Sequence, residues 1–136
     1  MRLALLTSLA LLFTSQAPEP GVLGQFQTPS GNTFCLVYAG DSGATLECEL
    51  KENVAKLPAR PKDCELDWGS RFSLPEKGKA VRGCYGDTLQ GELPKLEYGK
   101  PWKVGAFSCE ATTKRLRCTN ADGHGFELAR AAQKLF

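Results

Sequence analysis

The stretch TFCLVYAGDSGATLECEL, residues 33–50, predicts a β-hairpin closed by a disulfide. Its turn signal, GDSG, is centred between Asp41 and Ser42, and glycine and aspartate are typical of hairpin turns. Cys35 and Cys48 lie at equal distances on either side of that centre. In an antiparallel hairpin these two cysteines face each other within bonding reach, so we expect a Cys35–Cys48 disulfide.

A second cysteine pair shows the same symmetry further along the chain. In AFSCEATTKRLRCTN, residues 106–120, Cys109 and Cys118 are equidistant from the centre of the expected turn. This turn contains no glycine, so it constrains the register less than the first turn does. Cys64 and Cys84 remain and pair by elimination.

Six cysteines in a short chain indicate a disulfide framework in an exported protein. A zinc site is the competing interpretation, but zinc sites use close pairs such as C-x-x-C. The tightest spacing here is from Cys109 to Cys118. We therefore expect three sequential disulfides, no metal site and no cofactor.

Alternating apolar and polar residues predict half-buried strands in several segments. These are residues 45–50, 106–111 and 115–119. The run TFCLVY is apolar on both faces and predicts a central strand, while RFSL and KAVRGCY predict a hairpin around PEKG. Leu128, Ala131, Ala132 and Leu135 recur at helical spacing. The expected fold is all-β, a small antiparallel barrel or sandwich built from hairpins, with a short C-terminal helix.

Residues 1–17 have the features of a signal peptide. A positive charge at Arg2 precedes Leu3–Phe13, an apolar run of eleven residues. Such a run is too short to cross a bilayer and is typical of a signal-peptide core. Small residues lead up to Ala17, although Pro18 disfavours cleavage directly after it. We expect cleavage there and a secreted, periplasmic or cell-envelope location.

The rest of the chain has the length of one domain. We expect an N-terminal lead-in at 18–28 and a single disulfide-rich β domain at 29–136, with no membrane span. The formal net charge of the whole chain is +2. This is far from the basic footprint of a nucleic-acid-binding protein, so we expect no nucleic-acid partner.

The stretch CTNADGHGF, residues 118–126, holds the one histidine of the chain. As a general base, His124 would need a carboxylate to orient it, such as Asp122, and a nucleophile within reach. No serine lies in a G-x-S-x-G elbow. A structural turn accounts for more of these residues, because Gly123 and Gly125 permit positive φ. We favour the turn.

Paired carboxylates are a second enzymatic hypothesis, since hydrolases of cell-wall glycans use two. Asp67, Asp87 and Glu92 flank motif-like segments and are the candidates. DWG and YGD are equally typical of turns that close strands. We therefore assign no residue to catalysis.

A binding surface is the first non-enzymatic hypothesis. Trp68, Tyr85, Tyr98 and Trp102 are aromatic residues that could form a platform for a sugar or a peptide. The competing interpretation places at least two of them in the core.

The second non-enzymatic hypothesis is that the protein inhibits a secreted hydrolase. TTKR, residues 112–115, places Lys114 and Arg115 at a basic tip within the short loop that a Cys109–Cys118 disulfide closes. A loop constrained in this way binds with little ordering cost. A plain charged hairpin tip is the simpler interpretation.

Six short motifs occur in order along the chain: SGNTFC (30–35), LECEL (46–50), DWG (67–69), CYGDT (84–88), LEYG (96–99) and CTNADGHGFELAR (118–130). Together they resemble a family of small exported bacterial proteins of unknown function. The resemblance implies a six-cysteine secreted domain and supplies no catalytic residues. Thr33 departs from the pattern, which more often has an aliphatic residue there.

These observations favour a non-catalytic binding or interaction module of the cell envelope or extracellular space. The expected partner is an extracellular protein or a cell-wall glycan. The disulfide-constrained inhibitor is the alternative, and a small hydrolase that uses His124 or paired carboxylates ranks below both.

Overall fold

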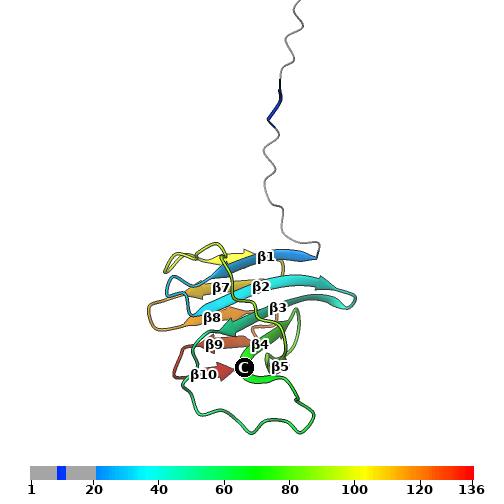
Figure 1. Ribbon diagram of the computed structural model, residues 1–136, viewed down its shortest axis with the longest axis vertical. Helices are drawn as coiled ribbons and strands as arrows, with labels where there is room; N and C mark the ends of the chain where they lie inside the picture. Colours follow the sequence, from blue (N-terminus) through cyan, green and yellow to red (C-terminus); the bar gives the residue numbers. More distant parts are fainter. Residues whose placement is uncertain (1–8, 12–20) are drawn as a thin grey trace, which may run out of the picture.

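The computed structural model describes residues 9–11 and 21–136, and in these residues it forms ten strands in two antiparallel sheets (Figure 1). The predicted signal peptide, residues 1–17, lies outside the described residues except for 9–11. The first sheet has the order β1-β2-β3-β4-β5, with β1 Val22–Gln27, β2 Thr33–Gly40, β3 Gly43–Leu50, β4 Asp67–Pro75 and β5 Val81–Tyr85. The second sheet has the order β10-β9-β8-β7-β6, with β6 Trp102–Val104, β7 Phe107–Ala111, β8 Leu116–Thr119, β9 Gly125–Leu128 and β10 Gln133–Leu135.

The two sheets pack on each other around one shared core. The Phe72 ring of β4 lies 6.1 Å from the Phe126 ring of β9, between ring centroids. At the other side of the core, Phe26 of β1 contacts Trp102 of β6 at 4.7 Å. The all-β prediction is confirmed, and two separate sheets make the fold a sandwich rather than a closed barrel. The segment expected as a lead-in, 18–28, contributes strand β1.

Disulfides hold both hairpins that the symmetry of the cysteines predicts. Cys35 of β2 lies opposite Cys48 of β3 in the strand register, and the two are bonded. Cys109 and Cys118 are bonded in the same way across β7 and β8. Alternation along each strand turns these four sulfurs into the core. The remaining bond, Cys64–Cys84, links the loop before β4 to β5.

The predicted C-terminal helix is wrong. Leu128 and Gln133 are opposite each other in an antiparallel pair of strands, β9 and β10. Ala129 N–H donates to the carbonyl of Ala132 at 2.9 Å and closes a tight turn between them. A helical spacing over so few residues gives too little stabilisation to form a helix alone. Pairing with β9 supplies backbone hydrogen bonds, and Leu135 still packs against the core.

A long connection, the crossover (residues 86–101), carries the chain from β5 to β6. It begins over the outer face of the first sheet, where the Thr88 hydroxyl bonds to Glu49 of β3. It then reaches the far edge of that sheet, where Gln27 N–H donates to the Pro94 carbonyl at 2.8 Å. Leu96 N–H donates to the Gln27 carbonyl at 2.9 Å. The crossover therefore spans the sheet and shields its outer face.

The described part of the chain includes no helix with the length and hydropathy that a membrane crossing requires. Within the same residues, no three His, Cys, Asp or Glu side chains come together as ligands for a metal ion.

Candidate functional site

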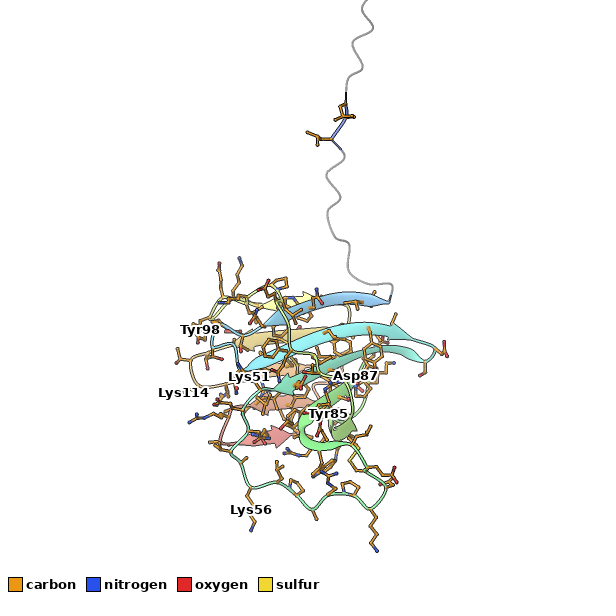
Figure 2. All side chains as sticks on the ribbon, viewed as in Figure 1. Lys51, Lys56, Tyr85, Asp87, Tyr98 and Lys114 are labelled. Carbon is orange, nitrogen blue, oxygen red and sulfur yellow. A yellow bond between two sulfur atoms is a disulfide. The ribbon has the colours of Figure 1, made fainter. Side chains whose placement is uncertain are left out.

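A cleft of about 370 Å³ opens at one end of the sandwich, where several connections between strands meet. The β1–β2 turn, the start of the β3–β4 loop, the β7–β8 turn, the β9–β10 turn and the crossover all contribute to its wall. Figure 2 shows Tyr98, Lys51 and Lys114 on this side of the molecule. We call this site the end cleft.

Asn32 places Lys51 at the end cleft. Its side-chain oxygen accepts a hydrogen bond from Glu52 N–H at 2.8 Å, and its amide donates to the Glu52 carbonyl at 3.1 Å. Lys51 N–H donates to the Asn32 carbonyl at 2.8 Å. These bonds continue the β2–β3 ladder past Leu50 and hold the Lys51 backbone beside the β1–β2 turn.

Tyr98 comes from the crossover, which turns sharply next to β7. Gly99 N–H donates to the carbonyl of Ala111, the last residue of β7, at 2.9 Å. Gly99 has a φ of 75°, which a residue with a side chain rarely adopts. The turn leaves the Tyr98 side chain 48 % exposed at the cleft.

The predicted basic tip also lines the end cleft. Thr112 N–H donates to the Arg115 carbonyl at 2.9 Å, and the Thr112 hydroxyl accepts from Lys114 N–H at 3.2 Å. The tip is thus a closed turn fastened by its own threonine. Lys114 and Arg115 belong to the wall of the cleft together with Tyr98, although the sequence suggested them for separate functions.

The end cleft is rich in positive charge. Its wall includes four cations, Lys51, Lys114, Arg115 and Arg130, and a single carboxylate, Glu52. Glu52 accepts from Arg130 at 3.3 Å, and Arg115 lies 3.8 Å from Glu127. Within the described residues, no ion pair involves Lys51 or Lys114. These two ammonium groups are therefore available to an anion.

The other three candidate aromatics lie elsewhere and form no platform with Tyr98. Trp102 packs its ring on Phe26 between the sheets. Trp68 donates its indole N–H to the Pro58 carbonyl at 3.0 Å. The ring of Tyr85 lies under the Arg71 guanidinium, 4.4 Å from its centroid.

His124 lies in the β8–β9 turn, at the end of the sandwich opposite the cleft. Asn120 organises this turn, because its side-chain oxygen accepts from the backbone N–H of both Asp122 and His124 at 3.1 Å. Asp122 accepts from Gly78 N–H at 3.0 Å and so fastens this turn to the β4–β5 turn. The carboxylate proposed to orient His124 thus has another partner.

The three candidate carboxylates, Asp67, Asp87 and Glu92, are exposed. The carboxylates that the structure does bring together are Glu47 and Glu49, on the outer face of β3. Glu49 is only 2 % exposed.

Arg71 of β4 lies between these two carboxylates. It contacts Glu47 at 2.6 Å and Glu49 at 3.7 Å. Glu49 also accepts from the Thr88 hydroxyl at 3.0 Å and from Leu89 N–H at 2.5 Å, while Arg71 donates to the Asp87 carbonyl. This ionic cluster therefore fastens the crossover to the sheet.

Two tyrosines border the ionic cluster. Burial, together with the Glu47 carboxylate, raises the pKa of Tyr38 above its ordinary value of 10.0. Burial, and then Glu49 and Asp67, raises the pKa of Tyr85 likewise. Burial alone lowers the pKa of Arg82.

Sequence reasoning missed Lys51 and Glu49. Glu47 and Glu49 alternate with Leu46 and Cys48, so the pattern assigns both to the solvent face of β3. Arg71 begins RFSL, the next predicted strand. A cation there was the one signal in the sequence that Glu47 and Glu49 could belong to a charged cluster.

The fold and the end cleft define a small, disulfide-bonded β-sandwich with a basic cleft between its loops. The chain belongs to the DUF6636 family, a family of unknown function whose model matches residues 4–136. Comparisons with curated proteins and with solved structures gave no match. All six cysteines are in disulfides, which indicates an oxidising environment, extracellular or periplasmic.

Proposed function

We propose that the protein is a non-catalytic binding module that takes an acidic glycan into the end cleft. The observation that supports this most is the convergence of one exposed aromatic ring, Tyr98, with the two unpaired ammonium groups of Lys51 and Lys114. An aromatic face stacks on the apolar face of a sugar ring, and ammonium groups neutralise its carboxylates.

The rest of the cleft wall favours a sugar over an apolar ligand. Short hydroxyl and amide side chains line it, namely Thr28, Ser30, Asn32, Thr112 and Thr113. Within the described residues the Thr113 hydroxyl has no hydrogen-bond partner, so it can exchange hydrogen bonds with sugar hydroxyls. The volume of about 370 Å³ falls in the range of roughly 300–1,000 Å³ that is usual for ligand sites.

A calorimetric titration with two matched oligosaccharides tests this proposal. Tetragalacturonate is the acidic probe, and cellotetraose is the uncharged control. We expect binding of the acidic probe that weakens as salt rises, since exposed charges are screened. Tyr98→Ala and Lys114→Ala should each weaken binding about fivefold to tenfold. Lys79→Ala, an exposed lysine at the opposite end of the sandwich, is the matched control and should bind as the wild type does.

Three results would contradict the proposal. One is that neither oligosaccharide binds. Another is that the Tyr98 and Lys114 variants bind tetragalacturonate as the wild type does. The third is that an oligoglutamate peptide binds at the cleft and tetragalacturonate does not, which would make the ligand an acidic protein segment.

A further inference from the structure

A second surface lies on the long loop between β3 and β4, residues 51–66, beyond Lys51 and Glu52, which belong to the wall of the end cleft. Figure 1 shows this loop extending away from both sheets. It exceeds the roughly 12–15 residues above which a connection without regular structure usually carries a function. Its apolar side chains include Val54, 64 % exposed, and Leu57, 37 % exposed.

The long loop is fastened on the N-terminal side of Lys56. The Asn53 amide donates to the Gly69 carbonyl at 3.2 Å, and its oxygen accepts from Ala55 N–H at 3.1 Å. Val54 N–H donates to the Arg130 carbonyl at 2.9 Å. This half of the loop is held to both sheets.

The loop is fastened again on the C-terminal side of Lys56. The Pro58 carbonyl accepts the indole N–H of Trp68 at 3.0 Å. Leu57 packs directly on the backbone of Gly69, where a Cβ would collide with the leucine side chain. Further on, Cys64 is bonded to Cys84 of β5. Lys56 is therefore the free apex between two fixed flanks.

The backbone at this apex is extended and its polar groups are free. Leu57 and Arg60 each precede a proline, a position that favours extended φ and ψ. Residues 56–61 accordingly contain no turn or bend. Among the described residues, the N–H and C=O groups of Lys56 and Leu57 have no hydrogen-bond partner.

Lys56 itself is exposed, and Figure 2 shows it directed outward from the loop. No carboxylate in the described part of the chain forms an ion pair with it. The free backbone groups of Lys56 and Leu57 can bond to the main chain of a partner, and the projecting Lys56 side chain can fill a pocket.

We propose that the long loop is an inhibitory docking segment for a serine endopeptidase with a carboxylate in its specificity pocket. Lys56 enters this pocket, as a lysine substrate does in trypsin. The prolines and the fixed flanks keep the segment in its bound conformation, which reduces the ordering cost of binding. If the Lys56–Leu57 bond is hydrolysed, the new C-terminus at Lys56 stays attached through β3. The new N-terminus at Leu57 stays attached through the Cys64–Cys84 disulfide.

Inhibition of trypsin by the oxidised protein tests the inference, with a chromogenic lysine p-nitroanilide as the reporter substrate. We expect an inhibition constant below about 1 μM, since protease–inhibitor pairs of this kind bind tightly. Lys56→Ala should weaken inhibition about 30-fold or more, as loss of an interface anchor does. Lys56→Arg should retain inhibition, and Lys56→Phe should move it from trypsin to chymotrypsin.

Two control variants test whether inhibition depends on Lys56 and not on another exposed lysine. Lys62→Ala, an exposed cation on the same loop, and Lys114→Ala, in the end cleft, should inhibit as the wild type does. Equal melting temperatures for the Lys56 variants and the wild type show that the fold is intact.

Absence of inhibition by the wild type would overturn the inference, as would a Lys56→Ala variant that inhibits equally well. Rapid and complete cleavage after Lys56 would overturn it too, because the loop would then be a substrate. None of these results bears on glycan binding, since the end cleft shares no residue with the apex.

Discussion

Gly123 and Gly125 flank His124 and are required for different reasons. Gly123 has a φ of 77°, in the left-handed region that penalises a branched side chain. Gly125 is not in that region, which corrects the expectation of positive φ at both glycines. A Cβ at Gly125 would instead collide with the carbonyl of Cys118 on the neighbouring strand. His124 contributes backbone hydrogen bonds with Asn120 that any residue except proline can form.

Substitutions in this turn should therefore rank by steric demand. Gly123→Val should lower the free energy of unfolding by about 1–3 kcal/mol because of the positive φ. Gly125→Val should cost at least as much, because the strand pair must separate to admit the side chain. His124→Asn should cost about 1 kcal/mol or less. Urea denaturation of the three variants measures the order, and a His124 variant less stable than both glycine variants would contradict it.

The raised pKa of Tyr85 predicts a loss of stability at alkaline pH. The folded protein favours the neutral phenol, so this contribution is fully present below pH 10 and is lost as the pH rises through the raised folded pKa. Tyr85→Phe cannot ionise, and its urea midpoint should fall less than that of the wild type between pH 9 and pH 11. If the urea midpoints of the two proteins fell equally with pH, the pKa of Tyr85 would be the same in the folded and the unfolded protein.

At the scale of elements, the ionic cluster joins the crossover to strands β3 and β4 of the first sheet, while Gln27 joins it to β1. Arg71 belongs to β4 and Glu49 to β3, and both also bind the crossover. A charge removed from such a site leaves its partner buried and uncompensated. The cluster thus makes the position of the first part of the crossover, residues 87–89, depend on the pairing of strands β3 and β4.

A double-mutant cycle measures this dependence. Arg71→Met should destabilise the fold by about 3–5 kcal/mol, because the Glu49 carboxylate, which is 2 % exposed, would lose the guanidinium that faces it. Adding Glu49→Gln removes the stranded charge, so the double variant should be more stable than the sum of the single effects predicts. Additive effects in chemical denaturation would mean that the two groups do not depend on each other.

The hairpins were predictable from the sequence and the end cleft was not. A hairpin depends on a turn and on alternation within a few residues, as in TFCLVYAGDSGATLECEL, so the sequence contains its signals locally. The cleft brings Tyr98 to the same wall as Lys114 because the crossover turns against the end of β7, where Gly99 N–H donates to the Ala111 carbonyl, and no local sequence pattern records that contact. At the C-terminus a local pattern gave a wrong prediction. The spacing of apolar residues predicted a helix, but the segment forms strand β10 and pairs with β9.

At the scale of the whole molecule, the disulfides divide into two kinds. Cys35–Cys48 and Cys109–Cys118 lie in the core, and none of their four residues is more than 3 % exposed. Cys64 is nearly buried, but its partner Cys84 is exposed at the sheet edge. A reductant therefore reaches one bond before the other two.

Graded reduction should reveal this difference. Denatured, unreduced protein should contain no free thiol, and peptide mapping should give the three pairs of the structure. With increasing phosphine reductant under native conditions, the thiols of Cys64 and Cys84 should be alkylated first, because the buried bonds need unfolding to react. A mapped peptide that joins Cys35 to Cys118, or early labelling of Cys109, would contradict the assignment.

The order of the disulfides along the chain affects how the protein can be made. No bond spans another, because each pair closes before the first cysteine of the next pair is reached. A chain that emerges from its N-terminus can therefore oxidise each pair in the order of synthesis, and the first thiols to meet are the native partners. We therefore expect oxidative folding to proceed without the slow reshuffling of mispaired bonds, with an oxidant and without an isomerase.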